Sequence, residues 1–118
     1  MVQYGKTRFD STFAALSDAT RRGVLEQLFR SDASISALAE QFGMTLTGMK
    51  KHVAVLEEAG LVSSKKVGRI RTCRLGPGRL EDEMKWIEAY RRQWAERFAA
   101  LDDVVAALKQ KENEIDKI

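Results

Sequence analysis

The sequence is poor in the residues that build disulfides and metal sites. Its 118 residues include a single cysteine, Cys73, and a single histidine, His52. One cysteine cannot form a disulfide within the chain, and there is no second thiolate to complete a tetrahedral metal site. We therefore expect a fold without disulfides in a reducing, cytoplasmic setting, and we expect no cofactor.

Long apolar runs and catalytic motifs are also missing. No stretch approaches the roughly 20 apolar residues that cross a bilayer, and the segment MVQYGKTRFD has no apolar core of an export signal. The sequence contains no Gly-rich phosphate loop, and no nucleophile motif accompanies His52. These absences argue against a membrane partner and against an enzyme.

Positive charge is concentrated in the middle of the chain. Residues 45–79 contain eight basic and two acidic residues, a net charge of +6, whereas the whole chain carries +3. A contiguous basic segment favours a polyanionic partner, and a solvated surface face is the alternative interpretation of the same charges.

Apolar spacing and capping residues predict four helices in the first half of the chain. The first runs from about residue 7 or 10 to residue 16, and the second begins after Asp18 as its N-cap. Ser34 or Ser36 can cap a short third helix that ends at Gly43, and Thr45 caps a fourth that ends at Gly60. The buried stripes expected on the second and fourth helices are Val24, Leu25, Leu28 and Phe29, and Leu46, Met49, Val53 and Leu56.

The third and fourth helices, joined by a tight turn at Gly43, are typical of a helix-turn-helix. The fourth would be the recognition helix, with Thr47, Lys50 and Lys51 largely off its apolar stripe. Two short β-branched runs, 61–67 and 70–75, flank Gly68 and predict a β-hairpin wing over residues 61–75. Cations at its tip suit a phosphate backbone better than a protein core. They are Lys65, Lys66, Arg69 and Arg71.

After Pro77 the pattern predicts one long helix over residues 80–111, followed by a polar tail that frays. Its apolar residues alternate by three and four, as in a heptad seam, except where Arg91 interrupts, and this seam exceeds what the rest of the chain can cover. We therefore expect a second copy of the chain against it. Trp86, Tyr90 and Trp94 are assigned to that interface, with the lining of a hydrophobic effector pocket as the alternative. The seam consists of Met84, Ile87, Trp94, Phe98, Leu101, Val105 and Leu108.

Three segments together resemble the ArsR family of repressors: LSDATRRGVLEQL, ISALAEQFGMTLTGMKKHVAVLEEAGLV and KKVGRIRTCRL. The resemblance covers roughly residues 12–108. It implies a mainly α-helical winged helix-turn-helix with a small β-hairpin, forming a homodimer through the first and last helices. Phe9 and Phe13 would then join the seam at the interface. It also implies a regulator of transcription, commonly a repressor of its own or a neighbouring operon.

The resemblance further implies DNA contacts on the recognition helix and the wing. Thr47 can meet a thymine methyl, and Gly48 permits a close approach of the backbone. Relatives often carry serine at the position of Lys50, so their base preference does not transfer. A dimer should read an imperfect palindrome in double-stranded DNA. The contacts carried over are Thr45, Thr47, Gly48, Lys50 and Lys51, with His52 at the margin and the four wing cations on the backbone.

The metal-sensing branch of the family carries a Cys-x-Cys pair where this chain has Ser34-Ile35-Ser36, or histidine and acidic ligands on its last helix. Serine hydroxyls do not replace thiolates for soft metals, and the last helix here has no histidine. The resemblance is therefore to the metal-independent branch, and the residues leave a small-molecule effector open.

Two interpretations stay open, one for Cys73 and one for the function of the chain. Cys73 is expected to be a partly buried strand residue, and the alternative is a thiol sensor whose pKa is lowered by Arg71 or Arg74. The chain is expected to be one domain, with a DNA-binding core at 7–79 and the long helix at 80–111. A protein-interaction module without sequence-specific DNA binding is the alternative function, and it leaves the basic segment unexplained.

Overall fold

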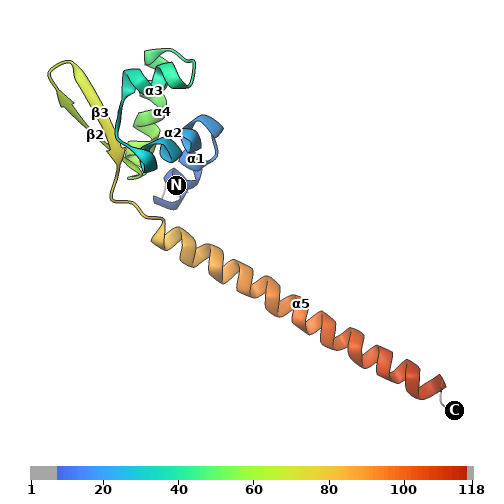
Figure 1. Ribbon diagram of the computed structural model, residues 1–118. Coiled ribbons are helices and arrows are strands. Elements are labelled where there is room, and N and C mark those ends of the chain that lie inside the picture. The colour runs from blue at the N-terminus through green and yellow to red at the C-terminus, as the bar shows by residue number, and fades with distance from the viewer. Residues whose placement is uncertain (1–7, 117–118) are drawn as a thin grey trace, which may run out of the picture. The chain divides into compact units, whose positions relative to one another are not determined.

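The computed structural model describes residues 8–116 and confirms the predicted fold class, mainly helical with a small antiparallel sheet (Figure 1). Its contacts divide the chain into two units, Met1–Glu81 and Asp82–Ile118. Within the described residues, no helix combines the length and the apolarity needed to span a membrane. The elements are α1 (Arg8–Leu16), α2 (Ala19–Arg30), β1 (Ala33–Ser34), α3 (Ile35–Gln41), α4 (Leu46–Glu58), β2 (Val62–Val67), β3 (Ile70–Leu75) and α5 (Glu81–Asp116).

Side chains predicted as caps begin the helices of the first unit. The Asp18 carboxylate accepts a hydrogen bond from the Arg21 backbone N–H at 3.0 Å, and Thr45 Oγ1 accepts one from Gly48 at 3.0 Å. Of the two serines proposed for the third helix, Ser34 is the cap, accepting from Ala37. Each cap satisfies a backbone donor that the helix start leaves unpaired, which is why these boundaries could be predicted locally.

The core of the first unit lies where α2, α3 and α4 meet. Val24, Leu38, Met49 and Leu56 have no exposed surface. The 3.6-residue periodicity predicted most of this stripe, because a helix buries residues three and four apart on one face. Burying α4 in this way leaves its opposite face in solvent.

Two residues predicted to be buried are exposed instead. Phe29 is 77% exposed and Leu46 is 43% exposed. Phe29 lies next to the last residue of α2, and Leu46 is the first residue of α4. Both project from a helix end, where fewer neighbouring side chains surround them, so the periodicity of the helix overestimated their burial.

The predicted hairpin is present, and a further strand anchors it. β2 and β3 pair from Val62 with Leu75 to Val67 with Ile70, turning at Gly68, whose φ is +62°. β1 pairs antiparallel with β3, placing Ala33 opposite Cys73. The sheet order is therefore β1-β3-β2. A strand of two residues has no period to detect, so the sequence does not predict it.

The second unit is a single helix, and it is longer than predicted. α5 continues to Asp116, so the expected end at Lys111 is wrong. Of the tail expected to fray, residues 112–118, the first five are helical and the last two lie outside the described residues. Glu112 and Glu114 are good helix formers, and no proline or glycine interrupts residues 112–116. Aromatic rings at every fourth residue contact one another along α5: Trp86 and Tyr90 stack with centroids 5.4 Å apart, and Tyr90 meets Trp94 edge to face.

The turn after the wing packs backbone against backbone. The Gly76 N–H donates to the Leu61 carbonyl at 2.9 Å, and the Gly78 N–H donates to the Gly60 carbonyl at 2.8 Å. A Cβ on Gly76 would lie only 2.5 Å from the Gly60 carbonyl oxygen. Glycine is therefore required at this position by space, and the base of the wing is held closely to the end of α4.

We predict that Gly76→Ala lowers the free energy of unfolding by about 1–3 kcal/mol, because the backbone must shift to admit the methyl group. Urea denaturation followed by circular dichroism measures this change. Pro77→Ala is the matched control in the same turn, since Pro77 is exposed and its loss should cost less than about 1 kcal/mol. Equal unfolding midpoints for the two variants would contradict the packing argument.

Candidate nucleic-acid interface

The outward face of α4 carries most of the contacts predicted on the recognition helix. Thr47, Lys50 and Lys51 are exposed, whereas Met49 is buried. At about 100° per residue, Thr47 and Lys51 lie on the side of the helix opposite Met49. Gly48 is half-buried beside them. The helix thus presents a hydroxyl and a cation outward from a rigid, buried support.

Thr45 has a structural role as the N-cap of α4. Its hydroxyl oxygen caps α4 by accepting from Gly48, and a Cβ on Gly48 would lie 3.1 Å from that oxygen. The hydroxyl hydrogen of Thr45 can still be donated. Gly48 therefore keeps the first turn of α4 open directly beside its cap.

The hairpin register separates the wing cations. Lys66 lies opposite Arg71, on the same face as the buried Cys73, while Lys65 lies opposite Thr72 on the other face. Arg69 is in the turn. Like charges directly opposite one another destabilise a hairpin. The Lys66–Arg71 pair is therefore unfavourable for the isolated hairpin and becomes favourable beside an anion.

A polar chain connects the wing to α4. Arg71 Nη1 donates to Ser64 Oγ at 3.0 Å, and Ser64 Oγ donates to the Glu57 carboxylate. Arg71 and Lys50 also line the same shallow cavity, of about 320 Å³, together with Glu57. The fold thus places a cation of the wing and a cation of the recognition helix, far apart in sequence, on one concave surface.

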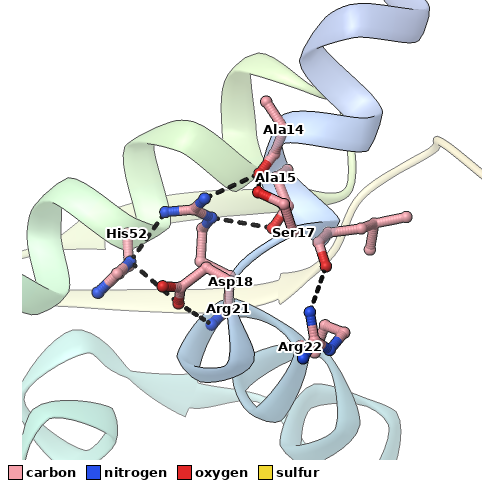
Figure 2. Close-up of polar contacts among 8 residues, drawn as sticks. Ala14, Ala15, Ser17, Asp18, Arg21, Arg22 and His52 are labelled. Carbon is pink, nitrogen blue, oxygen red and sulfur yellow. Dashed lines mark hydrogen bonds and ion pairs between the residues drawn. The ribbon is translucent and has the colours of Figure 1, made fainter.

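His52 differs from the other predicted contacts because it is partly buried against α2. Its side chain is 22% exposed, and Nδ1 lies 3.2 Å from Arg21 Nη1 and 3.8 Å from the Asp18 carboxylate. In Figure 2 the second ring nitrogen points away from both groups. Arg21 and Asp18 therefore occupy one side of the His52 ring, and its DNA contact stays a prediction.

Two arginines without a role in the sequence analysis hold the end of α1. Arg21 donates to the carbonyls of Ala15 at 2.9 Å and Ala14 at 2.8 Å, and Arg22 donates to Leu16 at 2.6 Å (Figure 2). The last carbonyls of a helix have no partner within it, so these guanidinium groups complete α1. The only sign in the sequence was the Thr-Arg-Arg run directly after the break between the two helices.

Asp18 is an anion in this arrangement. The hydrogen bond from the Arg21 backbone N–H lowers the pKa of Asp18 below its ordinary value, and the charges of His52 and Arg21 act in the same direction. Burial of the carboxyl opposes them. A carboxylate with a lowered pKa stays charged throughout the range in which histidine titrates.

Cys73 has the opposite environment to that of a reactive thiol. Burial and, to a smaller extent, the Glu57 carboxylate raise the pKa of Cys73 to about 11, against the opposing charge of Arg71. The thiol-sensor alternative required a lowered pKa and exposure, and Cys73 has neither. Among residues 8–116, no three side chains of His, Cys, Asp or Glu are grouped to hold a metal ion.

A larger apolar cavity of about 530 Å³ lies at the base of the wing. The exposed Phe29 ring is part of its wall, so the unpredicted exposure of this residue contributes to a concave surface. The cavity is separate from the predicted DNA contacts, none of which lines it. Its lining consists of Leu25, Phe29, Leu61, Leu75, Gly76, Gly78, Arg79 and Leu80.

Known proteins share this architecture. A family described as a helix-turn-helix domain matches residues 16–64. The uncharacterized HTH-type transcriptional regulator YuzN of Bacillus subtilis is 36% identical, over 67% of this chain and 95% of its own length. The transcriptional repressor SdpR of the same organism is 28% identical, over 66% of this chain and 87% of its own.

A solved structure with a similar fold is also that of a transcriptional regulator. An ArsR-like transcriptional regulator from Rhodococcus sp. RHA1 superposes with a TM-score of 0.73 at 35% identity, covering 85% of this chain and 92% of that one. The match extends over nearly the whole of the related chain, so it includes the helix-turn-helix and the elements around it.

We predict that Cys73 in the folded protein reacts with iodoacetamide at pH 7.5 at least about 100-fold more slowly than in the urea-unfolded protein. A pKa near 11 instead of the ordinary 9.0 lowers the thiolate fraction by this factor at neutral pH. Mass spectrometry of timed samples measures both rates. The folded-state rate should rise as the pH approaches 11, and equal rates in the folded and unfolded protein would show that the thiol is accessible.

Proposed function

Because the chain belongs to the ArsR family of winged helix-turn-helix transcriptional regulators, we propose that it represses its own or a neighbouring operon by binding an operator in double-stranded DNA as a homodimer. The observation that carries this proposal is the concave surface on which Lys50 of α4 and Arg71 of the wing meet. Two cations from separate elements, with Lys66 across the hairpin from Arg71, form a surface for a polyanion.

The proposed contacts divide by chemistry. Thr47 and Lys51 project from the outer face of α4 and would reach base edges in the major groove. The wing cations would neutralise phosphates, which sets affinity and register rather than sequence preference. The full set consists of Thr45, Thr47, Gly48, Lys50, Lys51 and His52 on the recognition helix, and Lys65, Lys66, Arg69 and Arg71 on the wing.

The homodimer is supported by the apolar stripe of α5. Trp94, Phe98 and Leu101 are 41%, 56% and 52% exposed, and soluble proteins rarely leave a stripe of this extent in water. A second copy with the same heptad spacing supplies a complementary stripe. The proposed interface is formed by Phe9, Phe13, Met84, Ile87, Trp94, Phe98, Leu101, Val105 and Leu108.

Dimer geometry determines the expected operator. Two recognition helices related by a twofold axis enter major grooves about one turn, roughly 34 Å, apart, so the operator should be an imperfect palindrome. Repression is further supported by the relative named as a transcriptional repressor. The protein would act in the cytoplasm, where bacterial DNA lies.

We also propose that this repressor does not sense a metal. Ser34, at one position of the family's cysteine pair, uses its hydroxyl oxygen to cap α3. Cys73 is buried and its thiol is protonated at neutral pH. A soft metal would therefore find no thiolate in either place.

We predict different effects for substitutions on the two DNA-facing elements. Lys51→Ala should weaken binding to the operator more than to a scrambled duplex. Arg69→Ala should weaken both alike and reduce the slope of log affinity against log salt by about 1 per protomer, because one phosphate contact is lost. Fluorescence anisotropy over a salt series measures this, with an operator selected from genomic fragments.

Lys109→Ala in α5 is the matched control, since it removes the same charge from a residue outside the proposed DNA contacts. A DNA affinity that changes neither with salt nor with Lys51→Ala and Arg69→Ala would contradict DNA recognition and favour the interaction-module alternative.

Leu101→Glu should lower the dimer affinity at least about 100-fold, because each of two copies loses a buried leucine. DNA affinity should fall with it. Ala99→Glu, about 160° around α5, adds the same charge away from the seam and should leave the dimer intact. Sedimentation velocity measures association, and a stable Leu101→Glu monomer that binds its palindrome with full affinity would refute the interface.

A further inference from the structure

The single histidine of the chain lies at the junction of three helices. Arg21 extends from the start of α2 to the last carbonyls of α1 and, with Nη1, to His52 Nδ1 on α4 at 3.2 Å (Figure 2). A guanidinium group only donates hydrogen bonds, so His52 Nδ1 must accept. The neutral ring then carries its proton on Nε2, the nitrogen that points away from Arg21 and Asp18 in Figure 2.

The free side of the ring lies beside the proposed DNA-binding face. His52 follows Lys51 by about 100° around α4 and lies one turn after Gly48. Its Nε2–H is therefore a donor at the flank of the recognition helix, where a phosphate lies when the helix occupies a major groove.

The charged groups that face His52 are Asp18 and Arg21, both at the start of α2. The Ala14 and Ala15 carbonyls of α1 accept hydrogen bonds from the same Arg21 side chain. On α4 itself, the residues one turn before and after His52 are uncharged: Gly48, Met49, Val55 and Leu56. A proton added at Nδ1 would end the contact with Arg21 and favour the Asp18 carboxylate, which lies 3.8 Å away.

We propose that His52 is a proton-linked phosphate contact, with Arg21 and Asp18 as its positioning residues. In the neutral ring Arg21 holds Nδ1 as an acceptor and directs Nε2–H outward. On protonation Nδ1–H pairs with Asp18, and Nε2–H becomes a cationic donor to the same phosphate. The inference rests on the proposed DNA binding, and it adds a dependence of operator affinity on pH.

The direction of the effect follows from charge. An imidazolium is stabilised by a phosphate, so DNA binding favours proton uptake, and operator affinity should rise as the pH falls from 8 to 6. Carboxylates titrate below this range, and the Cys73 thiol titrates far above it. One histidine per chain makes its contribution separable by a single substitution.

The first experiment needs no DNA. Long-range proton–nitrogen NMR at pH 8 reads the tautomer of the only imidazole, and the expected form is Nε2–H. Arg21→Lys, which lacks the fork that reaches both α1 and His52, should shift the ring toward a mixture of tautomers. A thermal melt confirms that this variant is folded. A predominant Nδ1–H form in the wild-type protein would overturn the inference.

The second experiment compares operator affinity at pH 6 and pH 8 at constant ionic strength. The wild-type dimer should bind about tenfold more tightly at pH 6, because two neutral hydrogen bonds become charge-assisted. His52→Gln, whose amide donates without titrating, should show no such change. Lys109→Ala is the control and should keep the tenfold ratio.

The positioning residues have distinct signatures in the same assay. Asp18→Asn keeps the N-cap of α2 but removes the carboxylate. The operator affinity of this variant should therefore differ by less than about threefold between pH 6 and pH 8. Arg21→Lys should lose more affinity at pH 8, where the tautomer must be held, than at pH 6. An equal loss at both pH values would indicate a purely structural role for Arg21 and refute its positioning role.

The outcomes separate this inference from the proposed function. If the wild-type protein binds duplex DNA with the expected salt dependence but equally at pH 6 and pH 8, the proton-linked contact is refuted and the repressor assignment stands. The contact is also refuted if His52→Gln keeps the wild-type pH effect. If no duplex is bound at either pH, both proposals fall together.

Discussion

The guanidinium of Arg21 is the contact on which the first unit depends. Only Ser17 and Asp18 separate α1 from α2, so the last carbonyls of α1 end directly beside the start of the next helix. Arg21 donates to the Ala15 carbonyl and shares the Ala14 carbonyl with Ser17, and it also contacts His52 on α4. Unpaired carbonyls at a packed helix end are costly, so this side chain couples the docking of α1 to the position of the recognition helix.

The wing is tied to the same helix by several independent contacts. β1 pairs with β3, the Gly76 backbone packs on Gly60, and Arg71 reaches Glu57 through Ser64. The recognition helix and the wing are therefore held together as one surface. Lys66 and Arg71 on this surface repel each other in the free protein, and a bound anion would reduce the repulsion. The electrostatics of the fold therefore favour the proposed partner, DNA.

Local features were predicted well, because their causes lie within a few residues. The caps Asp18 and Thr45, the left-handed Gly43 and the hairpin turn at Gly68 each depend on hydrogen bonds or backbone freedom inside one turn. The predictions that were wrong concern properties that depend on surroundings beyond the local sequence pattern. Phe29 is exposed by its position at a helix end, and α5 extends past Lys111 into a polar segment that contains no helix-breaking residue.

By itself, the sequence determined the helices, the hairpin and the basic segment, because periodicity, capping and charge are properties of neighbouring residues. Only the tertiary structure decided that Arg21 meets His52, 31 positions away, and that Lys50 and Arg71 share one surface. It also decided that the Cys73 thiol is buried with a raised pKa, where the sequence allowed a sensor. Each of these properties depends on distances between residues that are remote in sequence, and the folding of the chain sets those distances.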